Sequence, residues 1–345
     1  MDNVMLWQVS SIGELGPGRW YWEGNTVFVA EDPAARRVEL SVATYAFRGD
    51  ASDVTIGGLV VEKYAVPAQY GAITAAVPGD GPLGSGWVIE ESEVRLNHGA
   101  GVRLGERTRV SGLFLHHNGQ LGITASGGTG SIVEDTEIAD NNIAGFKWGW
   151  EAGGSKFKET TGLIVRRNDV HDNNGPGLWT DIDNYDTVYE QNRVVDNAGP
   201  GIFHEISYDA VINSNFVRAN GFSWDPWLWG SGILIAASAN VEVHDNTVID
   251  NADGIGGIQQ DRGDGPEGPR LLTNLYVHDN TVSVPDGAVG IGEDTGDRSV
   301  FTERNNRFES NTYVNMDGRR YLWSGRALDA AGWRNAGQDV DGTWR

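Results

Sequence analysis

The chain of 345 residues contains no cysteine, only 11 prolines and only three methionines. Without cysteine it has neither a disulfide framework nor a thiolate ligand for a metal. No apolar run approaches the roughly 18 residues that a membrane-spanning helix needs, and the first residues lack the basic and apolar regions of a signal peptide. We expect a secreted or periplasmic protein whose targeting segment is absent from this chain, with a cytoplasmic location as the alternative.

Basic residues are also scarce, because 26 Lys+Arg stand against 48 Asp+Glu and give a net charge of −22. Nucleic-acid binding needs a basic patch, so this balance excludes a nucleic-acid partner, and no membrane partner is expected. Glycine, by contrast, is abundant: its 48 residues are about 14% of the chain, against a usual share of roughly 7%. Abundant glycine together with 13 Trp indicates a folded, all-β protein with many tight turns.

Asparagine residues recur in the middle of the chain at intervals of 21 to 32 residues. They are Asn97, Asn118, Asn141, Asn173, Asn197, Asn220 and Asn251. A second asparagine stands five positions before the later members, and glycine plus an apolar residue follows four positions after most of them. Short segments rich in Val and Ile separate the repeats, without a helix-length amphipathic stretch. The pattern predicts a repeat protein built from short strands.

A repeat of 21–24 residues with several short strands cannot bury a core by itself, so successive units must stack. The regular leucine frame of leucine-rich repeats is missing. A parallel β-helix remains, in which each unit is one coil and equivalent residues stack at about 4.8 Å. Stacked asparagines then form hydrogen bonds along the helix, and glycines occupy corners that need a positive φ.

The coil at residues 167–178 combines Asn-x-Val, Asp-Asn and a glycine-rich corner. In these features the sequence resembles the right-handed parallel β-helix proteins of the pectate-lyase-like superfamily, over residues 53–315. The resemblance implies an all-β fold, a single-stranded right-handed parallel β-helix (solenoid) of about ten coils. We predict one domain over residues 1–345, with residues 1–50 as an N-terminal cap or first strands, residues 51–315 as coils and residues 316–345 as a C-terminal cap. The superfamily includes lyases, hydrolases, epimerases and viral tailspikes, so its fold does not select one activity.

Three stretches predict loops beside the coils: residues 151–160, 222–230 and 261–270. Insertions of this kind often wall the binding face of a solenoid. Two of them flank three segments that follow repeat glycines, which we align as strands at residues 145–151, 177–183 and 201–207. Because side chains alternate along a strand, this alignment directs four carboxylates to the outside, beside aromatic rings. They are Glu151, Asp181, Asp183 and Glu205.

Stacked carboxylates repel one another, so a functional site explains the cluster better than a solvated acidic face. Asp183 and Glu205 would lie diagonally at about 8 Å, a spacing that suits an inverting glycosidase. The leading hypothesis is therefore a glycoside hydrolase that cleaves a polysaccharide or oligosaccharide, with Asp181, Asp183 and Glu205 as acid and base. His204 is either a further catalytic group or a packed interior residue. The predicted substrate-binding residues are Lys147, Trp148, Trp150, Glu151, Trp179, Phe203, Tyr208, Trp224, Trp227, Trp229 and Arg262.

Calcium gives a second interpretation of the same acids, because Ca²⁺ takes six to eight oxygen ligands. Its ligands would be Asp181, Asp183, Glu205 and Asp209, a disposition that resembles the calcium sites of pectate lyases. A calcium-dependent polysaccharide lyase or C5-epimerase then needs a base, for which Lys147, Lys156, Lys158, Arg262 and His204 are candidates. A third interpretation is a non-catalytic, tailspike-like protein that binds glycans. Calcium is the only cofactor that the sequence suggests, and the oligomeric state stays open.

Overall fold

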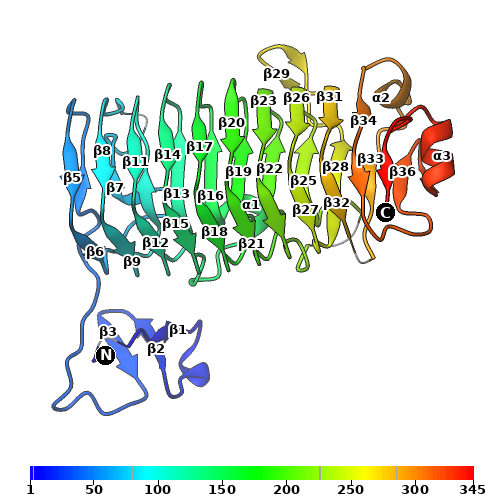
Figure 1. Ribbon diagram of the computed structural model, residues 1–345. Coiled ribbons are helices and arrows are strands. Elements are labelled where there is room, and N and C mark those ends of the chain that lie inside the picture. The colour runs from blue at the N-terminus through cyan, green and yellow to red at the C-terminus, as the bar shows by residue number, and fades with distance from the viewer. Residues whose placement is uncertain (3, 80, 225–226, 285) are drawn as a thin grey trace. The chain divides into compact units, whose positions relative to one another are not determined.

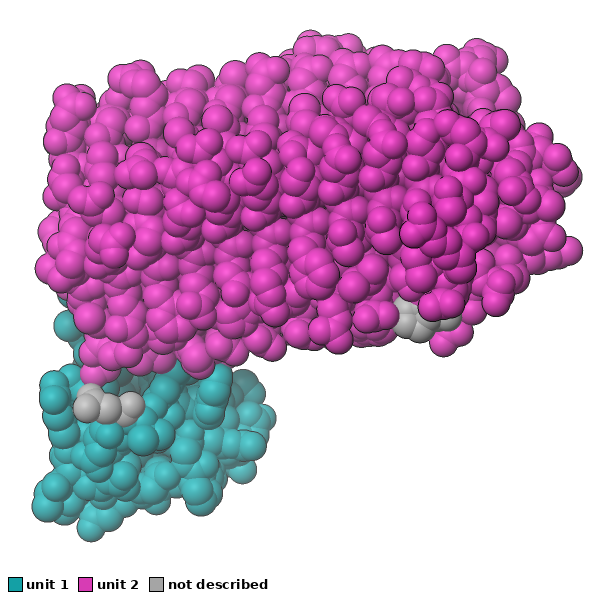
Figure 2. All heavy atoms as spheres, viewed as in Figure 1, with its two compact units in different colours: residues 1–43 teal, residues 44–345 magenta. Residues whose placement is uncertain are grey.

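The structure is a computed structural model that describes residues 1–2, 4–79, 81–224, 227–284 and 286–345. The chain divides into two compact units, residues 1–43 and residues 44–345, which Figure 2 colours separately. The smaller unit contains η1 (Ile12–Glu14) and a three-stranded sheet of β1 (Trp7–Gln8), β2 (Arg19–Glu23) and β3 (Thr26–Val29). The sequence predicted one domain over the whole chain, whereas the boundary between these units falls after Ala43.

Residues 44–345 wind as a parallel β-helix, in which each coil adds one strand to each of three sheets (Figure 1). The sheets hold 12, 10 and 11 strands in the described residues, and we name them by these numbers. Parallel neighbours pair in register, coil upon coil, and only β36 and β37 pair antiparallel within these sheets where the chain is described. The architecture predicted from the repeat is therefore confirmed.

From β4 to β36, apart from the hairpin β29–β30, the strands of the three sheets follow one another in rotation along the chain; β37 then returns to the 12-stranded sheet and β38 ends the 11-stranded sheet. The 12-stranded sheet contains β4 (Phe47–Arg48), β7 (Gly71–Thr74), β10 (Ala100–Arg103), β13 (Leu121–Ser126), β16 (Gly153–Lys158), β19 (Leu178–Asp181), β22 (Ile202–Glu205), β25 (Ser231–Ala236), β28 (Asp253–Gln259), β33 (Val289–Glu293), β36 (Tyr321–Trp323) and β37 (Arg326–Leu328). The 10-stranded sheet contains β5 (Thr55–Gly57), β8 (Val88–Glu90), β11 (Arg109–Ser111), β14 (Ile132–Glu134), β17 (Ile164–Arg166), β20 (Thr187–Glu190), β23 (Tyr208–Asn213), β26 (Ala239–His244), β31 (Thr273–His278) and β34 (Arg307–Glu309). The 11-stranded sheet contains β6 (Val60–Glu62), β9 (Glu93–Arg95), β12 (Phe114–His116), β15 (Glu137–Ala139), β18 (Asp169–His171), β21 (Arg193–Val195), β24 (Phe216–Arg218), β27 (Thr247–Ile249), β32 (Thr281–Ser283), β35 (Thr312–Tyr313) and β38 (Thr343–Trp344).

Short elements interrupt the coils at a few places. The helices are α1 (Trp148–Glu151), α2 (Ser299–Thr302) and α3 (Ala330–Asn335), and a small hairpin consists of β29 (Asp264–Gly265) and β30 (Gly268–Pro269). No helix of the described residues is long and apolar enough to cross a membrane.

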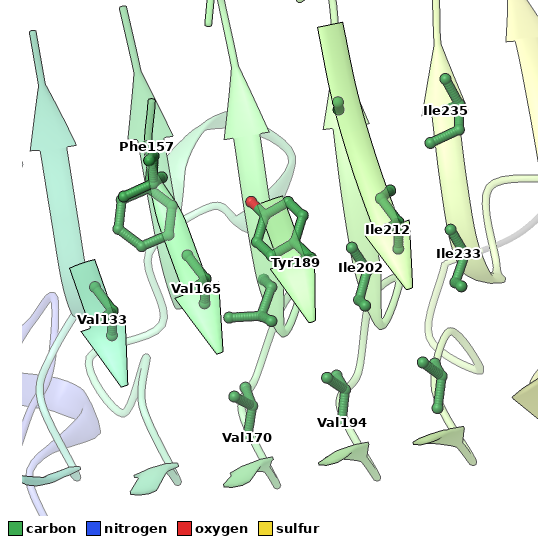
Figure 3. Close-up of a cluster of buried hydrophobic side chains, with 14 of the residues drawn as sticks. Val133, Phe157, Val165, Val170, Tyr189, Val194, Ile202, Ile212, Ile233 and Ile235 are labelled. Carbon is green, nitrogen blue, oxygen red and sulfur yellow. The ribbon is translucent and has the colours of Figure 1, made fainter. Parts of the chain in front are cut away.

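The core fills the space between the three sheets, and Figure 3 shows buried side chains of several coils pointing into it. Phe157 and Ile202 enter it from the 12-stranded sheet, Tyr189 from the 10-stranded sheet and Val194 from the 11-stranded sheet. The remaining side chains of each strand point outward. The two faces of the 12-stranded sheet therefore carry different residues, and its outward face holds the candidate site.

Two ladders of buried asparagines run along the helix at its corners. In the first, each side-chain amide donates to the Oδ1 of the asparagine one coil further on, at 2.9–3.1 Å, from Asn97 to Asn251. The second ladder runs from Asn168 to Asn311 at 2.9–3.0 Å. These contacts confirm the stacking that the asparagine repeat predicted.

The second ladder ends on a buried carboxylate at the C-terminal end of the β-helix. The Oδ1 of Asp339 accepts from the Asn311 amide at 2.9 Å. Its Oδ2 accepts from the Tyr313 hydroxyl at 2.6 Å and from the Trp333 indole at 2.9 Å. Trp333 of α3 belongs to the hydrophobic core, so this segment covers the last coil as a cap does.

Candidate functional site

The strand that follows Asn141 begins later than the sequence predicted. The Asn142 side chain binds the backbone N–H and carbonyl of Phe146 at 2.7 and 3.0 Å, which closes an inserted turn, and α1 follows. Strand β16 begins only at Gly153, and Phe157 pairs with Thr180, so Gly154 rather than Gly145 is the equivalent of Gly177. The prediction of a loop at residues 151–160 is therefore wrong. Lys147, Trp148, Trp150 and Glu151 lie in the insertion and not on the strand.

Lys156 and Asp181 form a buried ion pair on the outward face of the 12-stranded sheet. The Lys156 ammonium lies 2.8 Å from Asp181 Oδ2 and 3.7 Å from the centre of the Trp179 ring. It also donates to the carbonyl of Trp150 at 2.6 Å. The other oxygen, Asp181 Oδ1, is buried and has no hydrogen-bond partner among the described residues. Asp181 therefore keeps one carboxylate oxygen free.

Glu205 stands beside Asp181, because β19 and β22 pair these two residues directly in register. The Trp179 indole donates to Glu205 Oε2 at 3.2 Å, and the Arg262 guanidinium donates to Oε1. Burial raises the pKa of Glu205, and the negative charge of Asp181 raises it further, whereas Arg262 lowers it. Two carboxyl groups thus share one small region, one beside a lysine and the other with an elevated proton affinity.

Glu151 joins this pair from α1 instead of from the strand. It is only 4% exposed, its Oε2 accepts from the Gln69 amide at 2.5 Å, and its backbone carbonyl accepts from Gln120 at 2.7 Å. Burial raises the pKa of Glu151, and the charges of Lys156 and Lys158 oppose that rise. The prediction that Glu151 lies near the acids therefore fits the geometry, although its strand assignment does not.

Asp183 does not lie on the strand with the other acids. Strand β19 ends at Asp181, and Ile182 and Asp183 adopt left-handed backbone conformations with φ of 65° and 54°. The chain turns there, and the Asp183 carboxylate binds Arg270 at 2.9 and 3.0 Å. The sequence predicted that Asp183 and Glu205 lie diagonally at about 8 Å on one flat strand face. This prediction is wrong, because the turn takes Asp183 off the strand.

The four predicted calcium ligands do not converge. Asp181 and Asp183 face different cations, and Asp209 accepts from the Asn240 amide at 3.0 Å. Within the described ranges, no group of three or more His, Asp or Glu residues could hold a metal ion. The residues present therefore do not fit the predicted calcium site.

His204 points into the helix, to the opposite face of β22 from Glu205. It is fully buried, its Nδ1 lies 2.8 Å from the Thr180 hydroxyl, and its Nε2 finds no partner in the described part of the chain. Burial lowers the pKa of His204 to about 3. The proposed catalytic role is corrected accordingly, because a substrate on the outward face cannot contact this ring.

The predicted aromatic platforms form an apolar cluster outside the main core. Trp179 and Phe203 stack at 5.3 Å and are buried beneath Trp224 and Trp229 from the loop at residues 222–230. Trp227 packs against the same cluster, and Trp148 meets Trp224 edge-on at 4.4 Å. Asp225 and Pro226 of this predicted loop lie outside the described residues. Trp150, which is 49% exposed, is the most accessible of the tryptophans predicted to bind substrate.

Tyr208 lies away from the acid pair, where it stacks on Tyr185 at 4.8 Å beside the hairpin β29–β30. Gln69 and Arg270, which bind Glu151 and Asp183 respectively, were not among the site residues predicted from the sequence. Arg270 belongs to the predicted loop at residues 261–270, so the loop itself was a usable signal. Gln69 stands 82 residues before Glu151, and its partner could not be predicted without the coil register.

Comparison with known proteins supports the fold over most of the chain. Residues 83–223 match the family model described as right handed beta helix region. No curated protein sequence matches the chain. Among solved structures, XylC in its complex with xylose is similar with a TM-score of 0.65 and 16% identity, over 86% of this chain and 57% of XylC. This chain therefore spans little more than half the length of XylC.

Two bacterial enzymes share the same architecture. The A-modules of the Azotobacter vinelandii mannuronan C-5 epimerases AlgE6 and AlgE4 give TM-scores of 0.60 and 0.53, with 18% and 15% identity. The matches cover 84% and 82% of this chain and 78% of each module. Together with the parallel sheets described above, these similarities show that the chain is a right-handed parallel β-helix.

Proposed function

We propose that the protein is a carbohydrate-active enzyme that hydrolyses a glycosidic bond of its substrate. The substrate would bind with this bond placed between the carboxyl groups of Asp181 and Glu205. The observation that carries this proposal is the in-register pairing of these two buried carboxyl groups in different electrostatic surroundings. Glycoside hydrolases use two such groups, and environments that separate their proton affinities assign acid and nucleophile. Two proteins of similar fold, XylC in its complex with xylose and the mannuronan C-5 epimerase AlgE6, support a glycan substrate.

The spacing of neighbouring strands favours a retaining mechanism. Paired residues on adjacent strands lie about 4.8 Å apart, and retaining enzymes hold their carboxyl groups at about 5–5.5 Å. Substrate binding must first expose Asp181 Oδ1, which is buried in the free protein. In the first step, this oxygen then attacks the anomeric carbon while Glu205 transfers its proton to the departing glycosidic oxygen. In the second, the Glu205 carboxylate takes a proton from water, which attacks the anomeric carbon and releases Asp181. Only after the second step is the proton back on Glu205 and Asp181 again a carboxylate.

Arg262 covers the acid in the free protein. It occupies Glu205 Oε1, and its own side chain remains 30% exposed. A substrate whose glycosidic oxygen approaches Oε1 must displace this guanidinium. Its displacement removes the cation that lowers the pKa of Glu205. The pKa of Glu205 therefore rises when substrate binds, and the side chain keeps the proton that a general acid must donate.

A second candidate function rests on the cations beside the two acids. Lys156 and Arg262 could bind the carboxylate of a uronate, and a basic group could then remove the proton α to it, as in a lyase or epimerase. A lyase would form an unsaturated sugar together with each new reducing end, and an epimerase would invert C5 without cleavage, whereas hydrolysis forms a reducing end without unsaturation.

Product analysis separates these functions. The protein is incubated with a panel of neutral and acidic polysaccharides, with and without EDTA, while reducing ends and absorbance near 235 nm are recorded. Hydrolysis gives reducing ends without absorbance, and the anomer released first retains the configuration of the bond that was cleaved. Unsaturated products that depend on a divalent cation would overturn the hydrolase proposal in favour of a lyase. Binding without any product would favour a glycan-binding protein.

A further inference from the structure

Three cations lie on the outward face of the 12-stranded sheet, on the N-terminal side of the acid pair. Arg103 ends β10, and it pairs in register with Thr124 of β13, which in turn pairs with Lys156 of β16. Lys158 ends β16 in the row that continues toward Asp181. Arg103, Lys156 and Lys158 therefore form one band of positive charge on a chain whose net charge is −22.

Arg103 is buried and has no anionic partner among the described residues. It is only 7% exposed, and its Nε is buried with no hydrogen-bond partner among the residues that the structure describes. The guanidinium lies over the Tyr70 ring at 4.7 Å. The Tyr70 hydroxyl accepts from the Gly79 backbone N–H at 2.7 Å, which fixes the ring in place. The ring thus holds the guanidinium in one position while leaving its donors unused.

Three other buried or half-buried cations have anionic partners. Lys156, Arg270 and Arg304, whose side chains are 6%, 16% and 10% exposed, each face a carboxylate. Removing a guanidinium from water without a partner costs free energy, and folding alone does not select such a position. An external anion that accepts hydrogen bonds from the guanidinium would explain why the donors of Arg103 are unused.

We propose that Arg103, assisted by Lys158, forms a subsite for an anionic substituent on a sugar residue of the substrate. The proposal rests on the function proposed above and adds that the glycan carries carboxylate or sulfate groups. Three strand spacings of about 4.8 Å separate β10 from β19, which gives roughly 14 Å. Arg103 therefore contacts a different sugar residue from the one attacked at Asp181. A planar guanidinium binds a carboxylate or sulfate through two parallel hydrogen bonds, so this residue selects the charge of the substrate.

Equilibrium binding tests this subsite independently of turnover. Calorimetric titrations at low ionic strength compare uronate oligosaccharides, sulfated oligosaccharides and neutral xylo-oligosaccharides of two and of five residues. The variants are Glu205→Gln, to prevent cleavage, and Glu205→Gln combined with Arg103→Met, Arg103→Lys or Arg193→Met. Arg193 is an exposed cation of the 11-stranded sheet, so its variant controls for the loss of one charge.

We expect an acidic pentasaccharide to bind at least tenfold more weakly after Arg103→Met. After Arg103→Lys it should bind several-fold more weakly, because lysine keeps the positive charge but cannot form the two parallel hydrogen bonds of a guanidinium. Neutral pentasaccharides, acidic disaccharides and the Arg193→Met control should show no such change. A preference for the uronate or for the sulfated series identifies the anion. Equal binding of acidic pentasaccharides before and after both Arg103 substitutions would overturn the subsite. Failure of every uronate and sulfated oligosaccharide to bind the Glu205→Gln protein would overturn it as well. Since binding is the readout, a protein that cleaves no glycan can still confirm Arg103, and a failed subsite leaves the hydrolysis test unaffected.

Discussion

Glu205 is the residue on which the proposed chemistry depends most. Its carboxyl group lies between an anion, Asp181, and a cation, Arg262, in a position almost closed to solvent. Burial and Asp181 raise its pKa and Arg262 lowers it, so the proton affinity of Glu205 follows the position of Arg262. A glutamic acid with a raised pKa stays protonated at pH values where an ordinary side chain of pKa about 4.3 has ionised.

Removal of the cation should therefore extend activity toward alkaline pH. As a general acid, Glu205 works only while protonated, so kcat/KM falls as pH rises through its pKa. In Arg262→Gln the pKa of Glu205 rises, and we expect the alkaline limb of the pH profile to move upward by roughly one unit. Profiles of kcat/KM for the wild type, Arg262→Gln and Arg193→Gln check this. A limb that stays in place, or that moves to lower pH, would contradict the acid role.

His204 should make the fold sensitive to acid, independently of catalysis. Its pKa is about 3 when folded and about 6.5 when unfolded, so below pH 6.5 the unfolded chain binds a proton that the folded chain does not. The free energy of unfolding then falls as pH decreases, by up to about 1.4 kcal/mol per unit. Between pH 7.5 and 5 we expect the wild type to lose about 2 kcal/mol more than His204→Leu. Urea unfolding at both pH values measures the difference, and equal losses would show that His204 is not buried as described.

Individual site residues were predictable only where the strand was regular. Asp181 and Glu205 follow from the alternation of side chains and the repeat register, and the structure brings them together. Asp183 was not predictable in its real position, because the left-handed turn after Asp181 uses Ile182 and Asp183 instead of glycine. Its partner Arg270 lies 87 residues further along the chain, a separation that no local pattern reveals.

At the level of elements, the asparagine ladders hold the coils in register. The Asn197 amide donates to Asn220 Oδ1, Val170 O and Val195 O, and its own Oδ1 accepts from Asn173. Every internal member of a ladder therefore satisfies groups in neighbouring coils, and these groups are buried. The ladder contributes to stability mainly because its loss leaves several of them unpaired.

Asn197→Ala should destabilise the protein strongly. Each buried partner left without a hydrogen bond costs roughly 1–3 kcal/mol, so we expect a loss of at least about 3 kcal/mol in the free energy of unfolding. Arg193→Ala is a suitable control, because Arg193 is an exposed residue of β21 outside the buried ladders and forms only a surface ion pair with Asp169, so its loss should cost less than about 1 kcal/mol. Chemical denaturation of both variants measures the two costs. Similar values for the two variants would show that the ladder does not stabilise the coils.

The elements themselves were largely predictable from this repeat, since stacked asparagines and corner glycines recur once per coil. The exception is β16. One repeat of 32 residues contains two similar segments, Gly145-Phe146-Lys147 and Gly154-Ser155-Lys156, and either could begin the strand. The longer interval indicated an insertion, but not which of the two glycines begins the strand. The turn closed by Asn142 decides this, and it depends on contacts that a strand pattern does not express.

For the whole molecule, the β-helix unit contains both the core and the candidate site. Among large hydrophobic side chains of residues 1–43, only Met1 is buried in the described part, whereas Trp7, Trp22 and Leu40 are exposed. At the other end, Trp323 and Trp333 belong to the main core. The two ends of the chain therefore contribute differently to stability. The sequence predicted strands in residues 1–50, but their exposure depends on packing that composition does not reveal.

Deletions at the two ends should have opposite outcomes. A chain of residues 44–345 should melt within about 3 °C of the full protein and keep its activity, because its core and site are complete. A chain of residues 1–315 lacks Trp333 and Asp339, exposes the last coil and should unfold or aggregate. Thermal denaturation followed by circular dichroism compares both with the full chain. Failure of residues 44–345 to fold would show that the first unit is part of the β-helix fold.

The most direct test of the proposed active site compares three carboxylate substitutions on one cleaved glycan. With melting temperatures close to that of the wild type, Asp181→Asn and Glu205→Gln should each reduce kcat by a factor of about 10²–10⁴, the usual contribution of such groups. Asp183→Asn should reduce it less than about tenfold, because Asp183 binds Arg270 away from the paired acids. Full activity of folded Glu205→Gln, or an equal loss in all three variants, would contradict a catalytic pair formed by Asp181 and Glu205.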